Sequence, residues 1–275
     1  MNNAKRPEFP LLFFLLTLGF SWLFWMPLAF QAQGWLALPQ PLADFLASPL
    51  NPAPWAPTLM GFLITLIGAG WRGLGAWLKD GLNPRNPGRQ GWSMAIFLPL
   101  VIFLGAHLIE ALIRQHPPDL SILSNPPMAL IAPFVILLTG GPLQEEFGWR
   151  GYALPRLLHR YNALTASLWL GFFWWLWHLP LVFIPGRFMV NSLPLFLLLL
   201  VEITLTATLM TWVYRRTRQS ILAALVFHTL MNYSIWVLLP SMQVSAGLIL
   251  ITCALLALAV AGLVLREETQ HIHQG

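Results

Sequence analysis

The stretch MALIAPFVILLTGGPLQEEFGWRG, from Met128 to Gly151, holds the features that decide the fold and locate a candidate site. Its first half is a continuous apolar run of the kind that enters a lipid bilayer. Its second half places Glu145 next to Glu146, with Arg150 four residues after the second glutamate. Ionisable groups inside membrane helices are costly and mark function by default. The stretch therefore predicts a membrane helix that carries charge for a chemical purpose.

The whole chain has the composition of a polytopic membrane protein. Of its 275 residues, 57% are hydrophobic and 9% are charged, against about 25% charged residues in an ordinary soluble domain. Its mean hydropathy is +0.67. The formal net charge of +5 would suggest a nucleic-acid partner in a soluble protein, but here the basic residues are better interpreted as topology signals. The single cysteine, Cys253, excludes an internal disulfide framework.

Eight apolar runs are long enough to be transmembrane helices, each needing about 20 residues. They lie at 10–30, 54–71, 92–113, 128–147, 163–184, 194–213, 220–239 and 244–265. We find no repeat and no separate soluble region, so we expect an all-α bundle of about eight transmembrane helices forming one domain over residues 1–275. The N-terminal run has no small-residue cleavage site and is interpreted as a retained helix.

Charge gives an independent test of this layout, because cytoplasmic loops are enriched in Lys and Arg. With both termini in the cytoplasm, 13 of the 15 basic residues fall on the inner side, and Arg114 and Arg187 are the exceptions. We therefore expect a multi-pass protein of the cell membrane with cytoplasmic termini. The segment 71–90 has apolar residues at helical spacing, which fits either a surface helix or an extension of the second span.

The two glutamates of the opening stretch have different neighbours on a helix. Glu146 and Arg150 are spaced i,i+4 and can pair on one face. Glu145 is rotated by about 100° from Glu146, so the two carboxylates cannot face one partner. We predict that Arg150 holds Glu146 while Glu145 faces something else. Gly140–Pro142, just before them, can loosen the helix.

Two further clusters of polar residues lie in later spans. Trp174 stands one turn before His178, so its ring can wall one side of the imidazole. His228 and Asn232 share a face at i,i+4 in the seventh span, and Ser220 is a plausible N-cap for that helix. By this layout His178 lies deep in the fifth span, and the three clusters are compatible with one cavity open to the cytoplasm.

A carboxylate, two imidazoles and an amide are the groups that water-mediated acyl hydrolysis needs. Glu145 could act as general base toward water, and an imidazole could share that proton or pass it to the leaving amine. The other imidazole and the Asn232 amide could donate to a developing oxyanion. Alternatively, Glu145, His178 and His228 could bind Zn²⁺ with water in the open position. The residues alone leave both possibilities open.

Each polar residue also has a purely structural interpretation. Glu146 with Arg150 could be a structural ion pair, and Trp174 could be ordinary packing. His107 and Glu110 are three residues apart and could pair with each other. Glu202 could bond a neighbouring helix or a water, or support the site. The combination of clusters favours a site over these separate interpretations.

These residues resemble a known family, the CAAX-protease and bacteriocin-processing (CPBP, or Abi) proteins. Residues 145–150, followed by Gly151, resemble its EExxxR motif. Trp174 to His178 resembles FxxxH, and His228 to Asn232 resembles HxxxN. The motifs occur in the family's order over about 140–235. One departure is Trp174, where the family has Phe, and its larger ring should narrow the pocket.

The resemblance implies an intramembrane endopeptidase acting on a membrane-associated protein or peptide. Carried over, Glu145 would activate water with help from His178, and His228 with Asn232 would form the oxyanion site. Glu146, with Arg150, would brace the site. Family enzymes are named metalloproteases, whereas eukaryotic relatives have been interpreted as glutamate-dependent, so a Zn²⁺ cofactor stays open.

A second class of function is a non-catalytic membrane protein, such as an immunity or scaffold factor that binds a peptide or lipid in the same cavity. The full set of polar residues favours the enzyme, because a pseudoenzyme would be expected to have lost at least one. A transporter is less favoured, since no inverted repeat is seen. We expect membrane lipid and a protein or peptide substrate as partners, and no nucleic acid.

Overall fold

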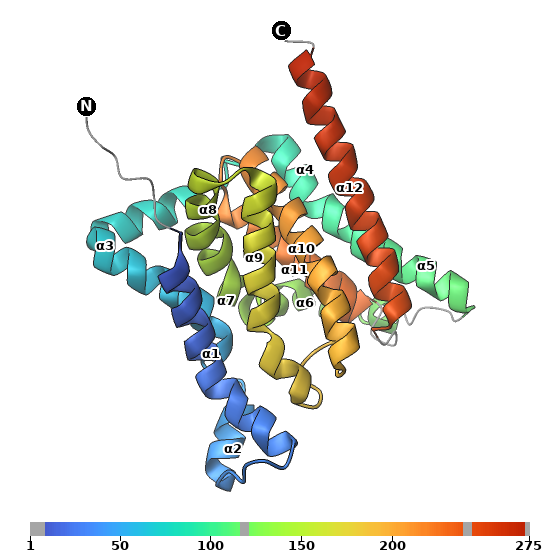
Figure 1. Cartoon of the computed structure of the whole chain (residues 1–275). Coiled ribbons are helices and arrows are strands. Elements are labelled where there is room, and N and C mark those ends of the chain that lie inside the picture. The colour runs from blue at the N-terminus through green and yellow to red at the C-terminus, as the bar shows by residue number, and fades with distance from the viewer. Residues whose placement is uncertain (1–8, 116–120, 239–243, 273–275) are drawn as a thin grey trace.

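The computed structural model describes residues 9–115, 121–238 and 244–272, and within them all regular structure is helical (Figure 1). The α-helices are α1 (Leu11–Ala32), α2 (Gln40–Ala47), α3 (Ala56–Gly81), α4 (Gly88–Pro99), α5 (Gly105–Arg114), α6 (Pro126–Thr139), α7 (Pro142–Glu146), α8 (Leu154–Arg160), α9 (Ala163–Trp177), α10 (Leu193–Arg216), α11 (Ile221–Tyr233) and α12 (Ala246–Ile272). Short 3₁₀ turns, η1 (Ala53–Trp55), η3 (Ser121–Ser124) and η5 (Leu179–Phe183), and π-helical segments, η2 (Leu100–Leu104), η4 (Phe147–Ala153) and η6 (Ser234–Leu238), connect or extend them. The all-α prediction is confirmed.

The expected spans correspond to helices in the structure. Within the described residues, six helical stretches are long and apolar enough to cross a membrane: 11–32, 53–81, 88–114, 126–160, 163–183 and 193–216. Two shorter apolar helices, 221–237 and 246–262, occupy the last two expected positions. The chain is therefore an integral multi-pass membrane protein. The basic residues Lys5 and Arg6 lie outside the described residues.

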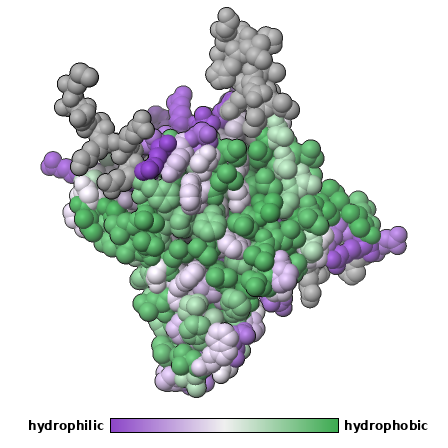
Figure 2. Space-filling view, viewed as in Figure 1, coloured by the Kyte–Doolittle hydropathy of each residue, from purple (hydrophilic) through white to green (hydrophobic). Residues whose placement is uncertain are grey.

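The surface of the molecule exposes many large apolar side chains, as expected for a protein surrounded by lipid. Large apolar side chains point outward along several helices, and Leu112 and Ile67 are 78% and 76% exposed. Figure 2 shows that apolar residues cover most of one face, with hydrophilic residues gathered mainly near its upper edge. A soluble protein rarely exposes so large an apolar area. Contact with lipid hydrocarbon explains it.

The two ends of the helical bundle can be told apart in Figure 1. The helix α1 begins, and the helix α12 ends, toward the upper end, where α8 also lies. The connection from α9 to α10 lies at the opposite end, as does α2. Because α1 begins and α12 ends toward the same end of the bundle, the chain crosses the membrane an even number of times, which agrees with the eight expected spans. Which end faces the cytoplasm stays a prediction.

Residues 71–90 were expected to form either a helix on the membrane surface or an extension of the second span, and the structure combines features of both. Helix α3 runs from Ala56 to Gly81, but Gly70 inside it has φ +65° and ψ −176°, which is not helical. Glycine adopts this conformation without the Cβ clash that other residues would meet. The chain therefore bends at Gly70 and continues helically to Gly81, so the span is extended by a second, redirected helix.

The fourth span differs from its expected bounds. We expected one helix over 128–147 with Glu145 at its end, but α6 stops at Thr139 and a corner follows at Gly140 and Gly141. Gly141 has φ +107°, a value reserved almost entirely for glycine. Helical structure then resumes in α7 and continues through η4 and α8 to Arg160. Glu145 therefore lies inside the bundle, just past a break, rather than at a helix end.

Close helix contacts hold this region in place. An added Cβ on Gly148 would lie 2.3 Å from the backbone of Pro57, so η4 approaches α3 at backbone distance. An added Cβ on Gly171 would lie 2.7 Å from Thr204 Cα, so α9 and α10 are equally close. Small residues allow such packing in membrane bundles. The helices that surround the candidate site are thus fixed by direct backbone contact.

Candidate active site

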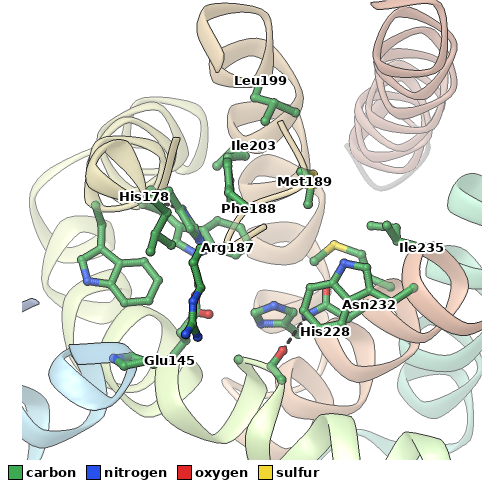
Figure 3. Close-up of a pocket in the computed structure, with 18 of the residues that line it drawn as sticks. Glu145, His178, Arg187, Phe188, Met189, Leu199, Ile203, His228, Asn232 and Ile235 are labelled. Carbon is green, nitrogen blue, oxygen red and sulfur yellow. Dashed lines mark hydrogen bonds between the residues drawn. The ribbon is translucent and has the colours of Figure 1, made fainter. Parts of the chain in front are cut away.

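A central cavity of about 630 Å³ lies among the α6–α7 corner, the end of α9, α10 and α11. Figure 3 shows Glu145, His178, His228 and Asn232 around it, with Leu199 and Ile203 of α10 along another wall. The three sequence clusters, 145–150, 174–178 and 228–232, therefore meet in space. A concave, mostly apolar site with a few convergent polar groups is the usual form of a small-molecule or peptide site.

Glu145 enters the cavity from α7 with one oxygen held by protein. The Trp174 indole Nε1 donates a hydrogen bond of 2.6 Å to Glu145 Oε2. Glu145 Oε1 makes no such bond and lies beside Gly141. Only 5% of Glu145 is exposed, so its free oxygen faces the cavity rather than bulk solvent. The carboxylate therefore has one anchored and one available oxygen.

Three polar atoms surround the space beside the Gly141 Cα atom. A Cβ built there would lie 2.7 Å from Glu145 Oε1, 3.5 Å from His228 Nε2 and 3.6 Å from Asn232 Nδ2. Because glycine has no side chain, the part of the cavity in front of these three atoms stays open. A bound water needs two to four polar partners, and these three atoms could supply them.

Glu146 faces away from this space and into a buried charge cluster. Its Oε1 accepts hydrogen bonds from Arg150 Nη1 at 2.8 Å and from His228 Nδ1 at 2.7 Å. Glu146 and Arg150 have no exposed surface, and His228 has 2%. The expected Glu146–Arg150 pair is confirmed. The contact with His228 was not expected, because 82 residues separate the two in sequence.

Arg150 links this cluster to Trp174. Its guanidinium carbon lies 4.3 Å from the centroid of the Trp174 ring, a cation–π distance. Its Nη2 also contacts Met210 Sδ at 3.0 Å. Trp174 thus contacts Arg150 with its face and Glu145 with its N–H. The two glutamates are separated as predicted, but one indole side chain connects their surroundings.

His178 follows directly after the last residue of α9, within the apolar stretch 163–183, and it is partly exposed and lines the cavity. The helix changes to the 3₁₀ turn η5 because Pro180 cannot continue the α-helical hydrogen-bond ladder. His178 Nδ1 lies 2.8 Å from the Trp174 carbonyl oxygen, which assigns the ring proton to Nδ1. Nε2 is then an acceptor. The ring stacks on Phe188 at 4.9 Å and meets the Trp177 edge at 4.7 Å.

Asn232 has a structural bond as well as a cavity position. Its Nδ2 donates to the Gly140 carbonyl at 2.8 Å, tying α11 to the corner before α7. The second hydrogen of the same amide nitrogen is free for a group beside Gly141. The helix that carries it begins at the expected N-cap, since Ser220 Oγ accepts from Ala223 N at 3.2 Å.

The donor arrangement does not match a metal site. Among the residues that the structure describes, no group of three or more His, Cys, Asp or Glu side chains is placed to hold a metal ion. The Nδ1 atoms of His178 and His228 are engaged by a backbone carbonyl and by Glu146, which leaves their Nε2 atoms as the nitrogens that could meet a ligand. Glu145, His178 and His228, the alternative Zn²⁺ ligand set, are not drawn together around one point.

Two further polar residues of the third span lie away from the cavity lining. His107 Nδ1 bonds the Phe103 carbonyl oxygen, while Glu110 accepts from Arg114 and Ser245. The pair between His107 and Glu110 that their spacing allowed is not formed among the described residues. They serve instead to hold α5 and, through Ser245, the start of α12.

Sequence reasoning missed several features of the site. Gly141 was expected only to loosen the helix, yet it also keeps the space between three polar atoms open. Trp174 was expected as a wall, and its N–H instead bonds Glu145. Gln144 and Arg187 line the cavity and were not singled out. The Gly141–Pro142 pair before two glutamates is the one sequence signal that could have indicated this corner.

The cavity reaches the end of the bundle opposite α8. Gly186 and Arg187, both exposed, belong to its lining, and the α9–α10 connection that carries them lies at the lower end in Figure 1. The charge-based layout places Arg187 on the outer side. We predicted both that the cavity opens to the cytoplasm and that both termini are cytoplasmic. These two predictions do not agree, because Gly186 and Arg187 lie at one end of the bundle, whereas α1 begins and α12 ends toward the other.

Comparison with known proteins identifies the region that contains these residues. Residues 126–234 match a family described as type II CAAX prenyl endopeptidase, Rce1-like. Over 104 residues, the chain is 36% identical to a protein of Methanococcus maripaludis named CAAX prenyl protease 2. That match covers 36% of this chain and 38% of the relative's length. Residues 126–234, which hold every site residue described above, therefore carry the signature of the Rce1-like CAAX prenyl endopeptidases, and the resemblance indicated by the three motifs is confirmed over that region.

Proposed function

We propose that the chain is an intramembrane endopeptidase that hydrolyses a peptide bond of a membrane-associated protein or peptide. The observation that carries this proposal is the arrangement beside Gly141, where Glu145 Oε1, His228 Nε2 and Asn232 Nδ2 lie together on the side that a larger side chain would occupy. A base and two hydrogen-bond donors around a single point are what addition of water to a carbonyl group requires.

Glu145 is the general base in this proposal. Its Oε1 accepts a proton from a water molecule in the space beside Gly141, and the water oxygen attacks the carbonyl carbon of the scissile bond. The Trp174 N–H holds Oε2, so the carboxylate cannot rotate away from the water. A fixed base close to its water contributes through orientation as well as through proton transfer.

His228 and Asn232 stabilise the oxyanion that this attack creates. When His228 is an imidazolium, Nδ1 donates to Glu146 and Nε2 donates into the cavity. The second Nδ2 hydrogen of Asn232 supplies another donor. Donors of this kind are worth most in a site that excludes water.

His178 assists the proton transfer that completes the reaction. With its proton on Nδ1 and the Trp174 carbonyl as partner, its Nε2 can take over from Glu145 the proton that water gave up, which returns Glu145 to its carboxylate form. The tetrahedral intermediate collapses as the carbon–nitrogen bond breaks, and the leaving amine takes this proton. The stacked ring of Phe188 and the edge of Trp177 keep the imidazole in place.

The relative's name suggests one substrate class to try first, a prenylated CAAX segment at a protein C-terminus. The match covers 38% of that relative, so the proposal is limited to hydrolysis of a peptide bond. A prenylated peptide and its unprenylated counterpart should be compared in one assay. Cleavage of either supports the endopeptidase.

The test compares Glu145→Gln and Glu145→Ala with the unmodified chain in proteoliposomes, using peptide cleavage followed by mass spectrometry. Loss of cleavage by about 10³-fold or more in both variants is expected for a missing general base. Asp44→Asn removes an exposed carboxylate on α2 and serves as the matched control, with unchanged cleavage expected.

Other outcomes lead to other assignments. Retained cleavage in both Glu145 variants would overturn the base assignment. Loss of cleavage with a chelator, restored by Zn²⁺, would point to the metal alternative despite the donor arrangement. Tight binding of peptides without cleavage by any form would support the non-catalytic binding protein.

A further inference from the structure

Glu202 is an ionisable residue on the cavity wall for which the proposed reaction has no use. It lies on α10, about 14 Å along a helix of about 36 Å, and so near the middle of a membrane span. Leu199, Ile203 and Thr206 lie on the same face at helical spacing and line the same cavity. Ionisable residues at this depth are rare and are expected to have a functional partner.

The Glu202 carboxyl has no hydrogen bond or ion pair with any residue that the structure describes. It is partly exposed, and the space to which it is exposed is the cavity. Glu110 and Glu146 are both paired with an arginine, and Glu145 accepts a hydrogen bond from Trp174. Glu202 therefore differs from these carboxylates in having an open side and no partner.

The surroundings of Glu202 select the kind of partner that could fit. Nearby lining residues are mostly apolar, and they include Phe188, Met189, Leu199, Ile203 and Ile235. Arg187 is the one lysine or arginine in the lining. Its guanidinium donates to the Ala47 carbonyl and forms no ion pair with Glu202. A carboxylate in apolar surroundings is stabilised by a cation that brings its own hydrogen-bond donors.

We propose that Glu202 forms a subsite that binds a basic side chain, lysine or arginine, of the peptide substrate. This inference rests on the proposed function, because the same cavity must hold the peptide. The apolar wall accommodates the aliphatic stem of the lysine or arginine, and the carboxylate meets its charged end. An acidic side chain is rejected, since it would place like charges in an apolar cavity.

The test uses three peptides that differ at one position, carrying lysine, uncharged norleucine or glutamate. A degenerate peptide library first identifies that position for the unmodified chain. Cleavage of the three peptides is then measured for the unmodified chain, Glu202→Gln and Glu202→Lys in proteoliposomes. Asp44→Asn again serves as the control, since its carboxylate lies outside the cavity lining.

We expect the unmodified chain to favour lysine over norleucine by about tenfold or more in kcat/KM, mainly through KM. Glu202→Gln should abolish that preference, measured as the ratio of kcat/KM for the lysine peptide to kcat/KM for the norleucine peptide. Glu202→Lys should favour the glutamate peptide. An equal lysine preference in the unmodified chain and in Glu202→Gln, or no preference in either, would overturn the subsite.

A binding experiment separates this proposal from the proposed function. Fluorescent lysine and norleucine peptides are titrated onto Glu145→Gln, with and without Glu202→Gln, and their dissociation constants are compared by anisotropy. A lysine preference that disappears with Glu202→Gln supports the subsite even if no peptide is cleaved. Equal binding of both peptides refutes the subsite even if Glu145-dependent cleavage is observed.

Discussion

The Trp174 indole donates to Glu145 Oε2 at 2.6 Å, and the other carboxylate oxygen of Glu145 is thereby left for the cavity. The same indole ring covers Arg150 and meets the His228 ring edge-on at 5.5 Å. Trp174 therefore contacts the proposed base, the proposed oxyanion donor and the buried arginine. Its N–H is a feature that the phenylalanine of the family motif could not provide.

Trp174→Phe should lower kcat with little change in KM. The substitution keeps an aromatic ring over Arg150 but removes the donor that fixes Glu145. Hydrogen bonds to charged groups are worth about 1.5–3 kcal/mol, and we expect the low end, about a tenfold loss of kcat. Steady-state cleavage kinetics would check this. A change confined to KM would show that Trp174 acts on substrate binding and not on the base.

Asn232→Ala should lower kcat by about 10²–10³-fold, the usual effect of losing one oxyanion donor. It also removes the bond to the Gly140 carbonyl, so thermal unfolding in detergent must be measured alongside cleavage. Ser234→Ala is the matched control on the following turn, because its hydroxyl bonds only a carbonyl of its own helix. Equal kcat for Asn232→Ala and the control would remove Asn232 from the mechanism.

Gly141→Ala should abolish cleavage in a protein that still inserts and folds. The new Cβ would lie 2.7 Å from Glu145 Oε1 and fill the point at which three polar atoms meet. The φ of +107° adds strain for a non-glycine residue, about 1–3 kcal/mol. Gly34→Ala is the control, because Gly34 has a φ of +74°, open space around it and a place outside the cavity lining. Both variants should lose stability, and only Gly141→Ala should lose its activity on peptides.

The sequence was sufficient to predict the helical membrane fold, and it was compatible with the convergence of the three motifs without requiring it. Hydropathy over about 20 residues detects membrane spans because each span must cross the same thickness of hydrocarbon as a hydrogen-bonded helix. The i,i+4 spacing also predicted the Glu146–Arg150 pair correctly, since both residues belong to one helical stretch. These successes concern local periodicity, where neighbours in sequence are neighbours in space.

The contacts between helices could not be predicted in this way. The His228–Glu146 and Trp174–Glu145 bonds join residues 82 and 29 positions apart, and they depend on how helices rotate and approach one another. The break at Gly141 changed the depth of Glu145, because the helix that follows starts from a new corner.

Arg150→Met should destabilise the fold by about 3–5 kcal/mol, because it leaves Glu146 as an uncompensated buried charge. Arg150 and Glu146 are completely buried, so solvent cannot replace the lost partner. Adding Glu146→Gln to Arg150→Met should recover part of the loss, since the unpaired charge is then removed. The double-mutant cycle is measured by thermal unfolding in detergent, with exposed Arg85→Met as control. Additive losses in the double variant would show that His228, and not Arg150, is the partner that stabilises Glu146.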